Sequence, residues 1–159
     1  MARSSRRKPS RSAPVYRRVE QLLFWIEPLV DRFPKALSFQ ERGRKILYDL
    51  HESLDLIALG LQAKAGTERL TYIRALHIRM TDVKTHVRCI RERSKNPSER
   101  CIAEPDPEHP APVQRLMTDR QYQTFITFML GIDFEISSWE GGNIPISADQ
   151  EAAHPDKTD

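Results

Sequence analysis

Long apolar runs, cysteine and glycine are all scarce in this chain of 159 residues. No stretch approaches the roughly 20 apolar residues needed to cross a bilayer, and the amino terminus lacks the apolar core of a secretory signal. Cys89 and Cys101 are the only cysteines, too few for a disulfide framework, which fits a reducing compartment. We therefore expect a cytoplasmic protein without membrane contact.

Sequence patterns for catalysis and metal binding are also missing. There is no glycine-rich phosphate loop and no Gly-x-Ser-x-Gly nucleophile motif. The two Glu-x-x-His motifs of di-iron bundles do not occur in the predicted helices. His86, Cys89, Cys101 and His109 could be imagined as a zinc set, but the cysteines lack the short spacing of a chelate. We predict no catalytic residue, no metal and no cofactor, and therefore no enzyme.

Charge is unevenly distributed, although the net charge is only +3. Residues 1–18 contain seven Arg or Lys and no acid, residues 140–159 contain five acids and one Lys, and the middle contains 17 of each. We predict a disordered basic arm at 1–14 and a disordered acidic tail at 141–159. The arm either contacts phosphates or only keeps the protein soluble. Its candidate phosphate contacts are Arg6, Arg7, Lys8 and Arg11.

Between these ends, apolar residues recur four times at steps of three and four, the period of one helix face. The four series are Val15, Val19, Leu22, Ile26, Leu29 and Phe33; Leu47, Leu50, Leu54, Ile57 and Leu61; Ile73, Leu76, Met80, Val83, Val87 and Ile90; and Tyr122, Phe125, Met129, Ile132, Ile136 and Trp139. They predict one all-α domain at 15–140, an antiparallel up-down-up-down four-helix bundle with a long proline-rich loop at 95–117.

Local signals predict where two of the helices begin. Ser38 and Glu41 have the spacing of a capping box, in which the hydroxyl and the carboxylate each accept a backbone N–H. The second helix should therefore begin at Phe39. Thr118 and Gln121 form a second capping box before the fourth helix.

Two further features of the second helix concern packing and charge. Gly43 lies alone within it, which favours a close approach by a neighbouring helix. Asp49, Glu52 and Asp55 form an acidic set three residues apart, which we interpret as a solvated or intersubunit ion-pairing face. After this helix, Gly66 suits a short turn into the third.

The third helix is the most basic part of the predicted bundle. Four of its basic residues fall within a narrow arc beside the apolar series: Lys84, Arg88, Arg91 and Lys95. Such a ridge costs a few tenths of a kcal/mol per like-charged pair unless an anion lies against it. The alternative is a solvated flank, partly neutralised by acids from a neighbouring helix. With the arm, the ridge predicts nucleic-acid binding through phosphates, and Arg74 and Arg79 are further candidates.

Several short motifs occur in an order found in a known family: Tyr16-Arg17-Arg18-Val19, a proline late in the first helix (Pro28), Phe33-Pro34-Lys35, a leucine-rich second helix, Leu116-Met117-Thr118 through Tyr122, and Trp139. In these motifs the chain resembles the four-helix-bundle family that contains two kinds of protein. One is the accessory variability determinant of diversity-generating retroelements, and the other is encoded inside intervening sequences of large-subunit ribosomal RNA genes. The resemblance covers residues 15–94 and 116–140.

This resemblance implies a homopentamer that binds template RNA, or DNA, together with the element's reverse transcriptase, and supports mutagenic cDNA synthesis. The loop at 95–117 is longer than the family's usual connection. Asp133 and Glu135 bring acids into the fourth helix, which argues against phosphate binding there. Two other functions stay open: a free-standing intervening-sequence protein without a reverse-transcriptase partner, and a protein-interaction module that uses the surplus apolar surface of the first helix and the acidic tail.

Overall fold

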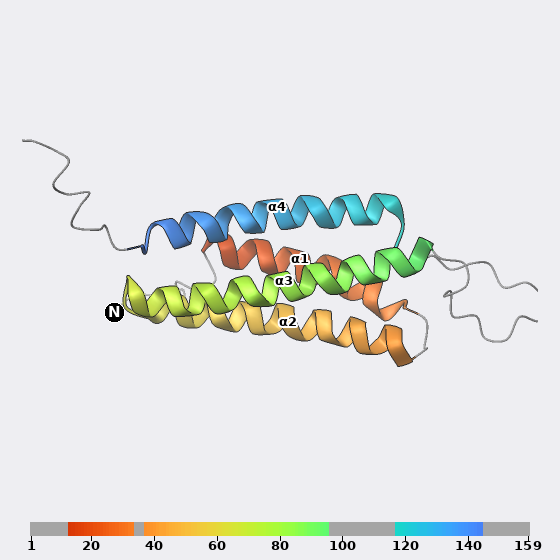
Figure 1. Ribbon diagram of the computed structural model, residues 1–159, viewed down its shortest axis with the longest axis horizontal. Helices are drawn as coiled ribbons and strands as arrows, with labels where there is room; N and C mark the ends of the chain where they lie inside the picture. Colours follow the sequence, from red (N-terminus) through yellow and green to blue (C-terminus); the bar gives the residue numbers. More distant parts are fainter. Residues whose placement is uncertain (1–12, 34–36, 96–116, 145–159) are drawn as a thin grey trace, which may run out of the picture.

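Four helices make up the computed structural model, which describes residues 13–33, 37–95 and 117–144. They are α1 (Pro14–Asp31), α2 (Leu37–Gln62), α3 (Thr67–Lys95) and α4 (Asp119–Gly141), as Figure 1 shows. The described ranges contain no strand, so the prediction of an all-α bundle is confirmed. Almost all of the predicted arm, loop and tail lies outside these ranges.

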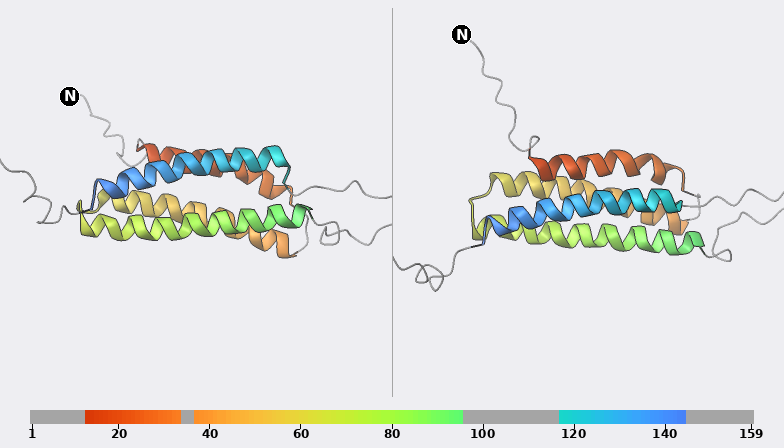
Figure 2. Two further views of the ribbon diagram at one scale, coloured as in Figure 1. Left: turned by 45° about the horizontal axis from the view of Figure 1, so that its top comes forward. Right: turned by 90° about the horizontal axis from the view of Figure 1, so that it is seen from above.

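The backbone of each helix runs close to those of two others. The backbones of α1 and α3 both lie close to α2 and α4, whereas α1 lies diagonally across from α3, and α2 from α4. α2 and α3 run in opposite directions. Arg42 of α2 lies against His86 of α3, and Asp49, later in α2, lies against Arg79, earlier in α3. Figures 1 and 2 show the same alternation of direction around an elongated bundle.

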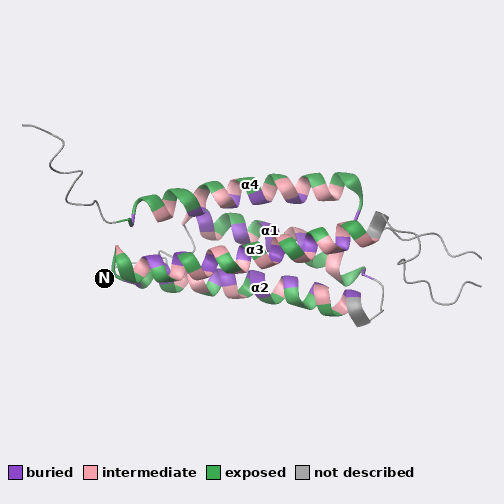
Figure 3. Ribbon diagram, in the orientation of Figure 1, coloured by how far each residue is buried: buried purple, intermediate pink, exposed green. Residues whose placement is uncertain are grey.

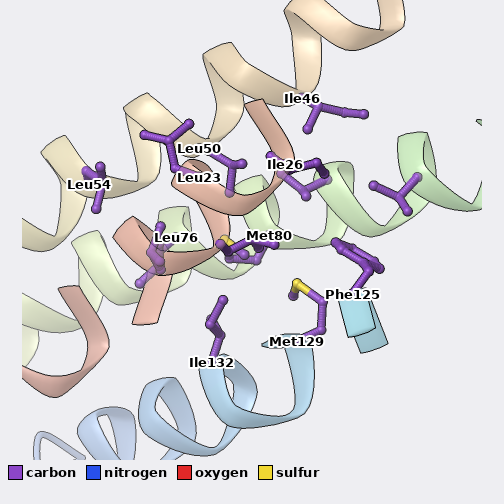
Figure 4. Packing of buried hydrophobic residues seen from close by; sticks show 14 of the residues in the cluster. Leu23, Ile26, Ile46, Leu50, Leu54, Leu76, Met80, Phe125, Met129 and Ile132 are labelled. Carbon is purple, nitrogen blue, oxygen red and sulfur yellow. The ribbon is translucent and has the colours of Figure 1, made fainter. Parts of the chain in front are cut away.

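The apolar series line the inside of the bundle, as the burial pattern in Figure 3 shows. The third series is buried along its whole length, and the four middle residues of the fourth series are buried as well. Side chains from all four helices meet in the core, including Ile26, Leu50, Met80 and Met129 (Figure 4). The helical period therefore predicted most of the core correctly.

The prediction for α2 was wrong in two details. Ile46 is fully buried and Leu47 only partly, because α2 contacts both α1 and α3 and buries a wider arc than a single series describes. The helix also begins at Leu37, so Ser38 lies inside it and is not its N-cap. Phe39, where the helix was predicted to begin, lies within its first turn and is buried.

Other local predictions are confirmed. Thr118 and Gln121 form the expected capping box, with the Thr118 hydroxyl accepting from the Gln121 N–H at 3.1 Å and the Gln121 Oε1 accepting from the Thr118 N–H at 2.9 Å. Gly43 does permit close packing, because a Cβ there would lie 2.6 Å from Cγ1 of Val30 in α1.

α1 continues past Pro28 to Asp31. No helix in the described ranges has both the length and the apolar character of a membrane span.

Side chains of α3 and of the residues after α4 stabilise the turn between α2 and α3. Gly66 takes a φ of 94°, a left-handed conformation that favours glycine. The Arg69 guanidinium donates to the carbonyl oxygens of Gly60 and Ala63, each at 2.8 Å, at the end of α2. These bonds satisfy carbonyls that have no partner within the helix. Asn143, just after α4, accepts from the Gly66 N–H at 3.1 Å, so the end of α4 is attached to this turn.

Candidate nucleic-acid interface

The predicted phosphate contacts fall into groups with different surroundings. Arg6, Arg7, Lys8 and Arg11 lie outside the described residues. Lys95 is the last residue of α3, and its side chain also lies outside the described part. Five predicted residues of α3 can therefore be placed.

Lys84 and Arg91 lie in a row of ion pairs between α3 and α4. His77, Lys84 and Arg91 follow one another at intervals of seven residues along α3. The His77 Nε2 lies 2.9 Å from a Glu140 carboxylate oxygen, and the Lys84 Nζ lies 2.7 Å from a carboxylate oxygen of Asp133. Arg91 pairs with Asp119. This row corresponds to the alternative in which acids of a neighbouring helix neutralise the flank.

Arg91 is also bound to the chain that leads into α4. Its side chain is only 11% exposed. Nη1 donates to the carbonyl oxygen of Met117 at 3.1 Å, and the guanidinium carbon lies 5.8 Å from the centre of the Tyr122 ring. Buried charge-assisted contacts of this kind stabilise the fold, so Arg91 positions the start of α4.

Arg79 faces α2, and this arrangement corrects the interpretation of Asp49. The Asp49 side chain is fully buried rather than solvated, and its Oδ1 accepts from Nη1 of Arg79 at 3.2 Å. The Arg79 guanidinium carbon also lies 5.8 Å from the centre of the Tyr48 ring. A buried carboxylate needs a close cation, and the α2–α3 contact supplies one.

Arg74 and Arg88 lie on the outer surface of α3. Both side chains are exposed, and neither has a hydrogen-bond or ion-pair partner in the ranges that the structure describes. Ile78, Thr81 and Thr85 lie between them on the same exposed side. Of the five placed residues, Lys84 and Arg91 therefore contact α4, Arg79 contacts α2, and Arg74 and Arg88 lie on an open surface. Their role in phosphate binding stays a prediction.

A denser group of cations lies where α2 begins and α3 ends. These two segments are side by side, since Arg42 contacts His86 and the Arg93 guanidinium carbon lies 5.7 Å from the centre of the Phe39 ring. We call residues 37–46 and 84–95 the basic end. It contains two acids, Glu41 and Glu92. Its eight cations are Arg42, Arg44, Lys45, Lys84, Arg88, Arg91, Arg93 and Lys95.

The basic end contains a pocket of about 260 Å³ between α2 and α3. Its lining residues are Glu41, Arg42, Lys45, His86 and Arg93. Neither Arg42 nor Lys45 forms an ion pair with any described residue. Among its described lining residues, the pocket therefore presents cationic groups from two helices and a single carboxylate.

The pocket disfavours the charged form of His86. Arg42 Nη1 lies 3.4 Å from His86 Nδ1, and because a guanidinium can only donate, a hydrogen bond here requires Nδ1 as the acceptor. Burial lowers the pKa of His86, and the charges of Lys45 and Arg42 lower it further. Asp49 and Asp82 oppose this effect.

Sequence reasoning missed this pocket because it considered the basic residues of one helix at a time. Arg42 and Lys45 are three residues apart on α2, a spacing that places them on the same side of the helix. Aligning α2 against α3 in opposite directions would have brought them to His86.

Comparisons with protein-family models, curated proteins and solved structures found no match. The family resemblance therefore stays a prediction. No three His, Cys, Asp or Glu side chains in the described ranges are grouped so that they could hold a metal ion.

Proposed function

We propose that this protein binds nucleic acid without catalysis and that the basic end of the α2–α3 pair contacts the phosphates. The observation that supports this proposal is the density of cations in two adjacent segments, which contain eight cations and two acids; of the eight, only Lys84 and Arg91 are paired with acids of α4 within the described ranges. Arg44, Lys45 and Arg88 are exposed there and have no partner among the described residues. Such a surface attracts phosphates of any sequence.

The charges of the other helices favour the same side. Acids of α4 already pair with Lys84 and Arg91, so the α3–α4 face offers less free positive charge. Arg74 extends the exposed cations along α3. The arm, with Arg6, Arg7, Lys8 and Arg11, would add contacts farther along a bound strand, because it precedes Ala13, which lies beside Leu61 and Trp139 at the other end of the bundle.

The test is RNA binding by the full chain across a salt series. We compare the double variant Arg44→Gln/Arg88→Gln with the matched control Arg17→Gln/Lys64→Gln, whose cations are exposed but lie outside the basic end. For contact with Z phosphates the logarithm of affinity falls with the logarithm of salt at a slope of about 0.7Z on single strands. We expect the slope to decrease for the first variant only. Absence of binding by the unaltered chain at low salt would refute the proposal.

A narrower proposal follows from the family resemblance: the protein is a homopentameric accessory subunit that joins template RNA to a retroelement reverse transcriptase. Exposed apolar side chains are available for subunit contacts. Leu130 and Phe134, about one turn apart on α4, are 66% and 69% exposed, and Phe24 on α1 is 64% exposed. Light scattering should then give five times the chain mass, and co-expression with a reverse transcriptase encoded beside the gene should give a stable complex. A monomer that purifies alone would contradict this narrower proposal.

The competing function is a protein-interaction module. It is favoured by the same exposed Leu130 and Phe134, and by the neutralisation of Lys84 and Arg91. The salt series separates the two functions, because binding through apolar contacts should respond little to ionic strength.

A further inference from the structure

We infer that the pocket between α2 and α3 is a phosphate-binding site, in which Arg42, Lys45 and His86 hold one phosphate group of a bound nucleic acid. This inference rests on the proposed function and names the place where a phosphate is held rather than only attracted. The other cations of the basic end would then act through their charge alone.

The lining of the pocket matches the chemistry of a phosphate. Arg42 and Lys45 come from α2 and His86 comes from α3, so donors approach the pocket from two sides. Guanidinium and ammonium groups form strong charge-assisted hydrogen bonds to phosphate oxygens. Lys45 has no hydrogen-bond or ion-pair partner within the described ranges, and Arg42 uses only one N–H in its contact with His86. Both can therefore turn to an anion without breaking an ion pair.

Like charges that face one another make the unoccupied pocket unfavourable. Arg42 and Lys45 both line it, and Glu41 is the one carboxylate among its described lining residues. Repulsion between neighbouring cations costs free energy that a bound anion removes.

His86 gives the site a distinctive response to pH. Its charged neighbours are Glu41, Arg42, Lys45 and Asp49 from α2 and Asp82 and Arg93 from its own helix. Without an anion, burial and the two cations keep its pKa below the usual value. A phosphate in the pocket would neutralise those cations, draw Arg42 away from Nδ1 and stabilise the imidazolium, so binding would take up a proton. Affinity should therefore rise as pH falls through the range in which His86 titrates.

The first experiment compares two double variants that remove the same charge from the basic end. Arg42→Gln/Lys45→Gln changes the pocket, and Arg44→Gln/Arg88→Gln changes exposed cations outside it. Both are tested for binding of one RNA sequence that carries either a 5′-phosphate or a 5′-hydroxyl. We expect the pocket variant to bind about tenfold more weakly than the other variant, the loss typical of a charge-assisted hydrogen bond.

The four outcomes are distinct. A greater loss for the pocket variant supports the site, and a loss seen only with the 5′-phosphate assigns it to a chain end rather than to the backbone. Equal losses for both variants would overturn the site and leave nucleic-acid binding intact. Absence of RNA binding by the unaltered chain would overturn the proposed function and this inference together.

The second experiment makes its measurement on the unaltered chain. The pKa of His86 is followed by NMR before and after addition of 5′-hydroxyl RNA, and a His86→Gln variant serves only to assign the signal. This RNA carries no phosphate monoester, whose own second pKa of about 6 would confuse the titration. We expect the pKa of His86 to rise. If the first experiment finds the loss with both RNAs, an unchanged pKa of His86 in the saturated complex would overturn the site.

Discussion

Asp49 of α2 and Arg79 of α3 form an ion pair in which the carboxylate is fully buried and the arginine is about one-third exposed. Oδ1 of Asp49 is bound by Arg79 at 3.2 Å, while Oδ2 is buried without a hydrogen-bond partner among the described residues. The carboxylate therefore depends on one cation. Because both helices contribute, the pair also fixes how α2 and α3 are aligned.

Removal of Arg79 alone should lower the free energy of unfolding more than removal of both charges. Arg79→Met leaves Asp49 buried and uncompensated, and we expect the free energy of unfolding to fall by about 3 kcal/mol. The double variant Arg79→Met/Asp49→Asn should recover more than half of that loss. Urea unfolding of the two single variants and the double variant measures both values. Additive losses would show that the two side chains do not depend on each other.

Arg91 and Arg88 should behave differently, although both were predicted as members of one ridge. Arg91→Gln removes the contacts with Asp119 and Met117, and we expect the free energy of unfolding to fall by about 2 kcal/mol. Arg88→Gln changes an exposed side chain and should stay within about 0.5 kcal/mol of the original protein. Thermal unfolding distinguishes them. Equal stabilities would mean that Arg91 does not hold the start of α4.

The stability of the protein should decrease in mild acid because of His86. Its pKa is lower in the folded protein than in the unfolded chain, so the unfolded chain binds the proton first as pH falls. The contribution is complete above the unfolded pKa of about 6.5 and is lost progressively as pH falls toward the folded pKa. Unfolding measured between pH 7.5 and 5 should show a steeper loss for the original protein than for His86→Gln. Parallel curves would assign the acid sensitivity to other groups.

Two helical glycines should respond oppositely to alanine. At Gly43 the new Cβ would lie 2.6 Å from Val30 Cγ1 and 3.3 Å from Phe33 Cδ2, and we expect a loss of about 1–3 kcal/mol. At Gly131 the nearest atom is Nη1 of Arg18, at the end of a flexible side chain, so Gly131→Ala should be neutral or stabilising by up to about 1 kcal/mol. Urea unfolding tests both. Recovery of Gly43→Ala by Val30→Ala would confirm that Val30 is the obstacle.

Apolar periodicity predicted the inside of this bundle better than its charged contacts. The third series is buried throughout because helix geometry alone places residues such as Ile73 and Val87 on one side. The partners of Lys84 and Asp49 could not be predicted in this way, because they depend on which helices are adjacent and how far each is shifted along its axis. Ile46 was missed for a related reason, since α2 faces two neighbours at once.

The bonds that Arg69 makes across the α2–α3 turn concern the order of folding as well as the final structure. Arg69 lies only nine residues beyond Gly60, whose carbonyl it binds, so this contact closes a very short loop. Short loops cost little chain entropy, and proteins that fold through local contacts fold quickly. We therefore expect the α2–α3 hairpin to form early in folding. Since the described lining of the pocket comes from these two helices, the pocket could be assembled before the rest of the bundle is complete.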